Sequence, residues 1–459
     1  MKVRNRKEIL SNAQSNVDRK ARKIILDAIE SAIKSVDPRE LIRSKVALSN
    51  GKLIVNKKIF DLKTFERIFV IGGGKASGYM AKAMEEVLDE RINEGIVIVP
   101  HGTAGFSKTK IIKIHEASHP IPDENSVEGA KKIMELIENA DESDLIICLI
   151  SGGGSSLMTY PRDEISLEDK RKVTELLLKC GATINEINAV RKHLSKFKGG
   201  QLAKSTYPAT LITLLLSDVV GDPLDVIASG PTVPDPTTFE DAINILKKYN
   251  IWNAVPDSVR ILLSRGVRGL SQETPKSDDP YLKRVYNFII GNNRIACLSA
   301  VNILKSAGLN TLLLTSYMEG EARNIGLFIG AIAREIVSSN NPVSRPAGIV
   351  AGGESTVTVV GSGIGGRNQE IALASALIIS GLKGVALASV STDGVDGPTD
   401  AAGAIVDGDT INRSKMMKLN CEEYLRNNDS YSFFKKLGDL IYTGPTGTNV
   451  NDILILVAL

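Results

Sequence analysis

A run of glycines followed by a lysine is the first stretch that could do chemistry. The segment RIFVIGGGKASGYMAKAMEE begins as a buried strand, passes through Gly73, Gly74 and Lys75, and continues as a helix. Small residues at such a turn let backbone N–H groups approach an oxyanion, and a lysine adds a charge suited to a phosphoryl oxygen. We therefore expect an anion-binding loop; a tight turn with an exposed lysine is the simpler alternative.

Two common phosphate-binding motifs do not fit this loop. A Walker A loop needs a glycine where Phe69 stands and a serine or threonine where Ala76 stands. A dinucleotide fingerprint needs a third glycine where Ser77 stands. The next strand also ends in Pro100 and His101 rather than in a ribose-binding acid. The loop therefore resembles an anion cradle that belongs to neither class.

A second glycine loop, LISGGGSSLM, follows another apolar run. Its backbone N–H groups and serine hydroxyls supply donors for a carboxylate or a phosphate. A serine-hydrolase elbow is excluded because Leu157 stands where that motif needs a glycine. The candidate ligand-binding residues of this loop are Ser151, Gly153, Gly154, Ser155 and Ser156.

Cations crowd the segment NAVRKHLSKFKGGQLA. A run of charges usually forms a solvated helix face. The grouping of Arg191, Lys192 and Lys198 beside a Gly-Gly pair also suits a clamp on a multiply anionic ligand. We predict that these three residues bind substrate or nucleotide.

Carboxylates follow two further apolar runs. Asp218 and Asp222 come after LITLLLS, where they could hold Mg²⁺ through water or accept a hydroxyl proton. Asp393 and Asp396 lie in the loop of VSTDGVDGPTDAAG and could share a magnesium ion with phosphate oxygens, because Mg²⁺ takes few protein ligands. Aspartates also stabilise turns through their own hydrogen bonds, so a structural role is the alternative.

Among the candidate stretches, the one with an arginine at the start of a helix is the hardest to explain as an ordinary turn. In GGESTVTVVGSGIGGRNQE, Glu354 follows a strand, and Arg367 and Asn368 stand where a helix begins. A helix N-terminus favours anions, and an arginine there adds a bidentate grip on a developing phosphoryl charge. In YTGPTGTNVNDILIL, Thr448 and Asn449 precede the last strand, either as polar ligands or as turn formers.

The elements that must position these residues alternate between strand and helix. Short apolar runs separated by helical patterns, the first over about 17–36, indicate βαβ units and a parallel sheet covered on both faces. Ligands bind beyond the carboxyl ends of such strands. The polar stretch GDPLDVIASGPTVPDPTTFED predicts a domain boundary, so we expect a Rossmann-like domain over 1–240 and a second α/β domain over 241–459.

Composition narrows the class of protein. The 459 residues are 43% hydrophobic and carry a net charge of only +3, which argues against a polyanion-binding protein. No apolar run approaches the roughly 18 residues that a membrane helix needs. Four scattered cysteines and four histidines lack metal-ligand spacing, and we expect a reducing cytoplasm. His119, in ASHPIPDENS, could contact a ligand or serve only its loop.

Together these stretches contain the kinds of residue that phosphoryl transfer requires. That reaction needs positioning, charge neutralisation and Mg²⁺ more than it needs a strong nucleophile. The residues alone therefore predict a two-domain α/β enzyme that acts on a small anion with a nucleotide.

The motifs also carry a family resemblance. IGGGKAS, HPIPDENS, LISGGGSSLM, NAVRKHLSKFKGGQLA, SDVVGDPLDVIASGPTVPDPTT, GGESTVTVVGSGIGGRNQE, STDGVDGPTDAAGAIVD and TGPTGTNVNDI stand in the order typical of the glycerate 2-kinase family. The resemblance runs from about residue 20 to the end, and its C-terminal part resembles the MOFRL domain.

This resemblance implies ATP- and Mg²⁺-dependent phosphorylation of D-glycerate at its C2 hydroxyl, which gives 2-phosphoglycerate. It implies a Rossmann-like domain and a second α/β domain with the active site in the cleft between them. Lys75 and Arg367 match the two basic residues expected to hold the transferring phosphoryl group. Asp218 and Glu354 are assigned to metal, base or hydroxyl contacts, and Asp393 and Asp396 to metal.

The resemblance also implies a cytoplasmic enzyme of sugar catabolism, of the kind that serves non-phosphorylating Entner-Doudoroff breakdown. Its partners would be D-glycerate and a nucleotide, with no nucleic acid and no membrane; the sequence leaves a homodimer open. Two alternatives are an oxidoreductase on hydroxypyruvate and a non-catalytic anion-binding module. The incomplete dinucleotide fingerprint argues against the first, and carboxylates beside cationic loops argue against the second.

Overall fold

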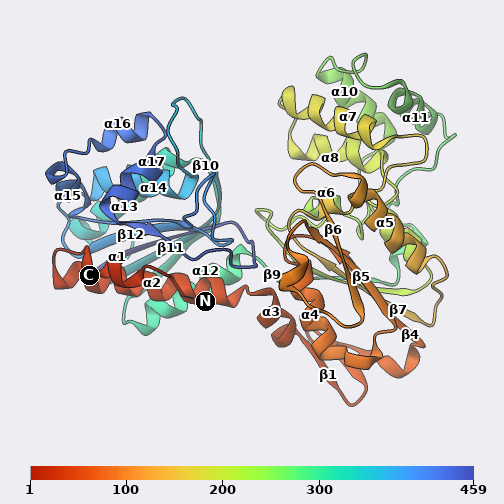
Figure 1. Ribbon diagram of the computed structural model, residues 1–459, viewed down its shortest axis with the longest axis horizontal. Coiled ribbons are helices and arrows are strands. Elements are labelled where there is room, and N and C mark those ends of the chain that lie inside the picture. The colour runs from red at the N-terminus through yellow and green to blue at the C-terminus, as the bar shows by residue number, and fades with distance from the viewer. Residues whose placement is uncertain (1) are drawn as a thin grey trace. The chain divides into compact units, whose positions relative to one another are not determined.

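The computed structural model describes residues 2–459, which form two compact units. Unit 1 consists of the residues up to Asp37 together with Gly291–Leu459, and unit 2 is Pro38–Ile290. Figure 1 shows that each unit is built around a sheet with helices packed against it. Among the described residues, none of the helices combines the length and the apolar composition needed to cross a bilayer.

Unit 2 contains a six-stranded sheet of order β6-β5-β4-β7-β8-β9. Its first five members in this order pair in parallel. β7 and β8 are buried along their whole length, which is why they read as unbroken apolar runs. The strands are β4 (Arg67–Gly73), β5 (Glu94–Pro100), β6 (Ile112–Ala117), β7 (Asp144–Ile150), β8 (Thr210–Leu216) and β9 (Val285–Gly291). The predicted α/β class with a Rossmann-like parallel sheet is confirmed.

Helices and a small antiparallel sheet complete unit 2. Figure 1 shows α7, α8, α10 and α11 gathered at one end of the unit, where their apolar faces share one core. The helices are α3 (Pro38–Lys45), α4 (Ser77–Leu88), α5 (Glu124–Ile137), α6 (Gly154–Leu157), α7 (Leu167–Lys179), α8 (Ile184–His193), α9 (Gln201–Thr206), α10 (Phe239–Lys248) and α11 (Asp257–Val267). Short 3₁₀ turns are η1 (Leu62–Thr64), η2 (Asp89–Arg91), η3 (Ala104–Phe106), η4 (Ile227–Ser229) and η5 (Pro280–Leu282). The antiparallel strands are β1 (Val46–Ser49), β2 (Lys52–Val55) and β3 (Lys58–Asp61).

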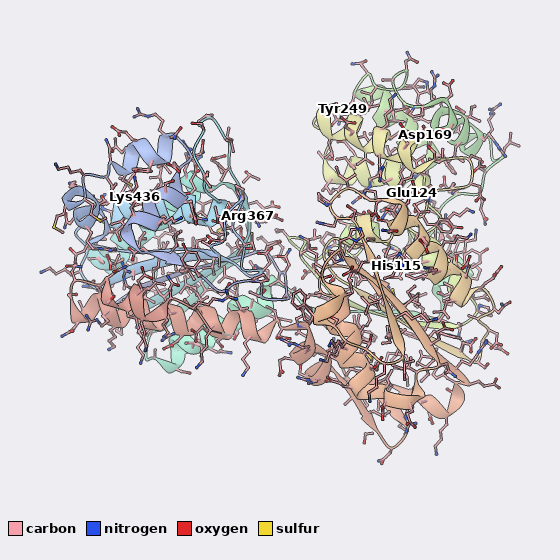
Figure 2. The ribbon with its side chains drawn as sticks, viewed as in Figure 1. His115, Glu124, Asp169, Tyr249, Arg367 and Lys436 are labelled. Atoms are coloured by element: carbon pink, nitrogen blue, oxygen red, sulfur yellow. The ribbon has the colours of Figure 1, made fainter. Side chains whose placement is uncertain are left out.

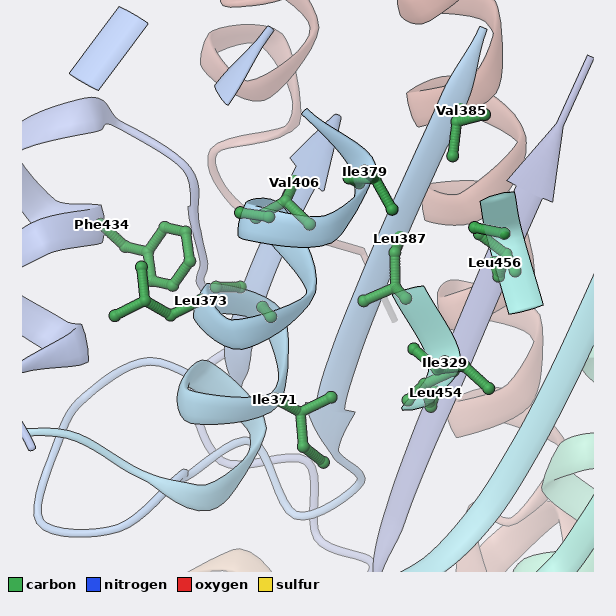
Figure 3. Close-up of a cluster of buried hydrophobic side chains, with 14 of the residues drawn as sticks. Ile329, Ile371, Leu373, Ile379, Val385, Leu387, Val406, Phe434, Leu454 and Leu456 are labelled. Atoms are coloured by element: carbon green, nitrogen blue, oxygen red, sulfur yellow. The ribbon is translucent and has the colours of Figure 1, made fainter. Parts of the chain in front are cut away.

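Unit 1 contains a mixed sheet of order β10-β11-β15-β12-β13-β14. β10 and β11 are parallel, and the other pairs are antiparallel. Figure 3 shows part of the core around α14, where Leu373 of the helix lies beside Phe434; Ile371 of the helix and Leu387, Leu454 and Leu456 of the sheet belong to the same cluster. The strands are β10 (Asn310–Glu321), β11 (Ala347–Thr356), β12 (Val385–Ser391), β13 (Gly403–Asp407), β14 (Leu440–Ile441) and β15 (Asp452–Ala458).

The helices of unit 1 come from both ends of the chain. They are α1 (Arg6–Ser11), α2 (Asn16–Ser35), α12 (Asn293–Ser306), α13 (Ala322–Ser339), α14 (Arg367–Ile379), α15 (Thr410–Met416), α16 (Cys421–Arg426) and α17 (Ser430–Leu437). α2, close to the predicted helix, packs against α12, β12 and β15. Its Arg22 is fully buried and pairs with Asp407 at 2.6 Å and Asp439 at 2.7 Å. This ion pair fixes the start of the chain to unit 1.

The two compact units do not divide the chain after residue 240, as the Pro/Gly-rich stretch suggested. That stretch runs inside unit 2, because α10 packs on α8 and α11, and β9 completes the sheet of that unit. The first 37 residues join unit 1 because the apolar face of α2 is buried against the distant C-terminal strands. Local composition marks a polar segment, whereas the division follows long-range packing.

Replacing Arg22 with methionine is expected to lower the free energy of unfolding by about 3–5 kcal/mol, because two buried carboxylates lose their cation. Asp407 and Asp439 each have a fully buried side chain. Urea denaturation followed by circular dichroism measures the change. Lys20→Met, at an exposed position of the same helix, is the control and should change stability by less than about 0.5 kcal/mol. Equal stability of the two variants would contradict the assignment.

Candidate active site

The two glycine loops of unit 2 lie against each other because β4 and β7 are neighbours. The Lys75 N–H donates to the Gly152 carbonyl at 2.8 Å, and the Ala76 N–H donates to Ser151 Oγ at 3.0 Å. Gly74 has a φ of +146°, and a Cβ placed on it would lie 2.2 Å from Ser151 Oγ. Only glycine tolerates this approach. The predicted ligand residue Ser151 therefore ties the two loops together.

Lys75 extends from this junction beside a histidine. Its side chain is exposed. A Cβ placed on Gly153 would lie 3.0 Å from His119 Nε2 and 3.4 Å from Lys75 Cγ, so all three groups meet there. Burial, and then the charge of Lys75, lower the pKa of His119 to about 4. His119 is therefore uncharged at neutral pH and leaves Lys75 as the cation of this group.

Asp218 lies on the other side of the same loop. It follows β8, is half-buried, and would be 1.9 Å from a Cβ placed on Gly152. His119 follows β6, Lys75 follows β4, and the loop itself follows β7. The carboxyl ends of four parallel strands thus bring a cation, a carboxylate and a neutral imidazole to one glycine loop. This is the edge of a parallel sheet where ligands bind.

The structure also brings together Arg191 and Lys198 of the cationic segment and Ser155 of the second glycine loop. An Arg191 guanidinium N–H donates to Ser155 Oγ at 2.6 Å. Lys198 Nζ lies 3.1 Å from the same oxygen and donates to the Ser155 carbonyl. Ser229 Oγ lies 2.8 Å from Ser155 Oγ and donates to Asn188 Oδ1 at 2.9 Å. Burial lowers the pKa of Arg191 to about 10.

Lys170 belongs to this group, although the sequence analysis missed it. It is only 3% exposed, and its Nζ has no hydrogen-bond partner among the described residues. Burial, and then the charge of Arg191, lower the pKa of Lys170 to about 7. A signal was present: Lys170 stands on the buried face of α7, between Leu167 and Val173. A lysine in the apolar stripe of a helix is a rare position that calls for a function.

Two predicted ligands of unit 2 have structural partners instead. Lys192 is buried and turns to Asp235, with its Nζ 3.3 Å from the fully buried carboxylate. Ser156 Oγ donates to the Gly153 carbonyl at 3.0 Å. These contacts stabilise the segment that carries Arg191 and the turn that carries Ser155. The predicted backbone positions Gly73 and Gly154 are both buried, and a Cβ on Gly154 would lie 3.0 Å from the Gly73 carbonyl.

In unit 1, Arg367 begins α14 and is held by two carboxylates (Figure 2). Its Nη1 lies 2.7 Å from Glu354, and its Nε lies 2.7 Å from Asp452. Burial alone would lower the pKa of Arg367, but Asp452 and Glu354 outweigh it and raise the pKa. Arg367 and Asp393 line a pocket of about 600 Å³ within unit 1. Its rim includes exposed apolar side chains such as Val359 and Val395.

Asp452 is a second site residue that sequence reasoning passed over. It is fully buried at the start of β15, and burial raises its pKa to about 7 although Arg367 and Asn368 lower it. Its signal in the sequence is an acidic residue at the first position of the apolar strand DILILVA. Because the carboxyl contacts Arg367 directly, its protonation state bears on how firmly the guanidinium is held.

The carboxylate of Asp396 accepts hydrogen bonds at the start of helix α14. Its Oδ1 accepts from the Asn368 N–H at 3.0 Å and its Oδ2 from the Gln369 N–H at 2.9 Å. Asn368 in turn bridges Asp396 and Asp452 through Nδ2 and accepts from Ser389. We interpret both as residues that build the start of the helix, where a carboxylate satisfies exposed N–H groups.

Among the described residues, no group of three or more histidine, cysteine or acidic side chains could hold a metal ion. Asp393 Oδ1 accepts from Ser391 Oγ at 2.7 Å and from the Val395 N–H at 2.9 Å. A magnesium role for Asp393 stays a prediction. For Asp396 the observed contacts favour helix capping over metal binding.

The side chains of Thr448 and Asn449 make structural contacts, which agrees with the alternative that they are turn formers. Thr448 Oγ1 donates to the Val36 carbonyl at 2.6 Å, which anchors the end of α2. Asn449 Oδ1 accepts from the Asn451 N–H at 3.1 Å. Their side chains therefore shape the loop before β15 and position Asp452.

Gly74→Ala is expected to separate the two loops and lower the free energy of unfolding by about 1–3 kcal/mol. The added Cβ would meet Ser151 Oγ at 2.2 Å. Gly105→Ala is the matched control, since a Cβ on Gly105 meets nothing within 4 Å. Guanidinium denaturation compares the two variants. A Gly74→Ala protein as stable as the control would show that the loops do not need this approach.

Lys75→Met is expected to raise the pKa of His119 above its value of about 4. The pKa should remain below the usual 6.5 for histidine, because burial, the larger cause, is unchanged. The imidazole signals in an NMR pH titration measure it, and Lys75→Arg, which keeps the charge, should leave it near the wild-type value. An unchanged pKa in Lys75→Met would place Lys75 away from His119.

The chain is similar to other named proteins along nearly its whole length. Residues 24–264 match a domain of unknown function, DUF4147, and residues 347–452 match the MOFRL family. The chain is 47% identical to the glycerate 2-kinase of Pyrococcus horikoshii, covering 95% of this chain and 97% of that one. It is 41% identical to a protein of Agrobacterium vitis named "Putative hydroxypyruvate reductase", covering 95% and 94%.

A solved structure agrees with these sequence matches. The crystal structure of glycerate kinase from Thermotoga maritima is similar with a TM-score of 0.85 and 42% identity, covering 95% of this chain and 99% of that one. The chain therefore belongs to the glycerate 2-kinase family and carries its C-terminal MOFRL domain.

Proposed function

We propose that the protein phosphorylates D-glycerate at its C2 hydroxyl with ATP and Mg²⁺, giving 2-phosphoglycerate and ADP. The observation that carries the proposal is the group at the glycine loops of unit 2. There an exposed Lys75 and the carboxylate of Asp218 flank Gly152 and Gly153. A fixed cation beside a carboxylate suits phosphoryl transfer, in which charge must be neutralised and a hydroxyl proton removed. The names of the relatives support the same reaction.

In the proposed reaction, the C2 oxygen of glycerate forms a bond to the γ-phosphorus of ATP. The bond between that phosphorus and the β,γ-bridging oxygen breaks, and ADP leaves with the electron pair. The hydroxyl proton passes to Asp218. Lys75 is assigned to the oxygens of the transferring phosphoryl group, where a fixed cation stabilises the transition state. Arg367 is assigned to the phosphates of the nucleotide in the pocket that it lines.

The pocket beside Arg367 is the proposed place for the nucleotide. Its volume of about 600 Å³ falls in the range of cofactor pockets, and its apolar rim beside a guanidinium fits a base and phosphates. Glu354 and Asp452 hold the guanidinium in place before ligand arrives. Asp393 lines the same pocket, and Mg²⁺ commonly takes one or two carboxylates together with phosphate oxygens. When bound, Mg²⁺ would neutralise charge on the triphosphate.

A second candidate function is reduction of hydroxypyruvate, which the name of the Agrobacterium vitis relative favours. A dinucleotide fingerprint would need glycine at Ser77. Its hydroxyl instead lies 3.0 Å from Ser151 Oγ and donates to the Leu149 carbonyl. That position therefore serves the junction of the two loops, and we rank the reductase below the kinase.

Phosphorus NMR of the protein with D-glycerate, ATP and Mg²⁺ tests the proposal, and a 2-phosphoglycerate signal is the expected result. Lys75→Ala and Arg367→Ala should each lower kcat by about 100-fold or more, since each removes a cation that neutralises phosphate charge. Lys108→Ala, at an exposed position of unit 2, is the control and should keep wild-type activity.

The other outcomes separate the alternatives. A 3-phosphoglycerate signal would keep the kinase and overturn the position of transfer. No phosphoglycerate, together with NADH or NADPH oxidation in the presence of hydroxypyruvate, would favour the reductase. Loss of activity in Lys108→Ala as large as in Lys75→Ala would remove the specific role of Lys75.

A further inference from the structure

Three cations of unit 2 lie together in a buried place without any acid. Lys170 and Lys198 are 3% and 1% exposed, and the half-buried Arg191 is close enough to repel the charge of each. Burial lowers the pKa of each, and the mutual repulsion of the cations adds to this at both lysines. No carboxylate among the described residues offsets that repulsion.

Two other lysines of the same segment are paired with acids. Lys192 pairs with Asp235, and Lys196 pairs with Asp163. The fold therefore supplies acids to the two lysines that lie between Arg191 and Lys198 in the sequence, whereas none of the described acids pairs with Arg191 or Lys198. Buried charges without partners are costly and are kept where a ligand completes them.

The groups that hydrogen-bond to Arg191 and Lys198 are the neutral hydroxyl and carbonyl of Ser155. Arg191 and Lys198 converge on Ser155 Oγ at 2.6 and 3.1 Å, and Ser229 Oγ lies 2.8 Å from the same oxygen. Lys170 Nζ has no partner at all among the described residues. Figure 2 labels Asp169, the residue that precedes Lys170 on α7. The Lys170 ammonium carries three N–H donors and meets no acceptor among the described residues, so a bound anion would satisfy it.

We propose that Lys170, Arg191 and Lys198, together with Ser155, form a buried binding site for the carboxylate of a 2-hydroxy acid. This deepens the proposed function, on which it rests, by assigning the acceptor substrate to named residues and adding Lys170 to the site. The bound carboxylate would accept from Lys170 Nζ and share the donors that now point at Ser155.

The burial of the group favours a carboxylate over a triphosphate. Ser229, which lies against Ser155, and Asn188, which accepts from Ser229, are 1% and 3% exposed, so a small anionic group suits these surroundings better than a large one. Ser155 stands two residues after Gly153, beside which Lys75 and His119 lie. Two residues span at most about 7 Å. A short acid bound by its carboxylate would therefore present the neighbouring C2 hydroxyl toward Lys75.

Isothermal titration calorimetry of the whole chain tests this site without relying on turnover. D-glycerate should bind to the wild type, and glycerol, which has the same hydroxyls and no carboxylate, should not. Lys170→Met should weaken D-glycerate binding by about 10- to 100-fold, the loss expected for one charge-assisted hydrogen bond, and leave ADP binding unchanged. Lys172→Met, at an exposed position of the same helix, should bind as the wild type does.

Thermal unfolding without ligand supplies a second readout. Lys170→Met should raise Tm at pH 7.5, because burial lowers the pKa of Lys170 to about 7 and folding must therefore remove a proton that the unfolded chain keeps. The gain should shrink as the pH rises toward 10, since the unfolded chain with its ordinary lysine pKa of 10.5 then loses the proton as well. A lysine that only supports the fold would give a lower Tm on replacement.

The outcomes are distinct. Unchanged D-glycerate affinity in Lys170→Met, or a loss confined to ADP, would overturn the assignment, and the latter would give the cations to the nucleotide. If Lys170→Met does not fold, Arg191→Met takes its place with the same expected loss of D-glycerate binding. If the wild type binds D-glycerate in a Lys170-dependent way but yields no phosphoglycerate, the site stands and the kinase proposal fails. If neither D-glycerate nor lactate binds, the carboxylate site itself is wrong.

Discussion

The candidate site of unit 2 depends on the close approach of two backbone loops at the edge of a parallel sheet. A Cβ on Gly72 would lie 2.1 Å from the Leu149 carbonyl, and one on Gly74 would lie 2.2 Å from Ser151 Oγ. With side chains absent at these positions, the loops after β4 and β7 bond directly to each other. This contact sets where Lys75 leaves the backbone and where the turn toward Ser155 begins. The other groups of the site are arranged around it.

Charge pairing distinguishes the structural cations of this protein from those that await a ligand. Arg22 and Lys192 are buried, and each lies against a fully buried carboxylate. Lys170 is buried to a similar degree and faces no acid among the described residues. Arg367 stands between these cases, since its two carboxylates hold it while one edge of it lines a pocket. The same residue types thus differ in function because of what lies within hydrogen-bond reach.

Much of the fold and part of the site could be predicted from the sequence. Unbroken apolar runs such as β7 and β8 report burial on both faces, and the grouping of Arg191 with Lys198 was visible in a short segment. The role of Asp396 could not be read in this way, because loop geometry decides that its oxygens turn to the start of α14. Lys170 was not grouped with Arg191 and Lys198 because these two cations belong to α8 and the segment beyond it, far from Lys170 in the sequence. The division into two compact units likewise follows contacts between segments that are distant in the sequence.

The discontinuous makeup of unit 1 has a consequence for synthesis on the ribosome. Arg22 and Asp407 are 385 residues apart, an interval that translation at roughly 5–20 residues per second covers in about 20 to 80 s. Unit 2 emerges whole within that time, whereas α2 must wait with its apolar face uncovered until β12 and β15 appear. The nascent chain therefore carries an exposed amphipathic segment through most of its elongation. Chaperone capture and ribosome-proximal aggregation would act on this segment first.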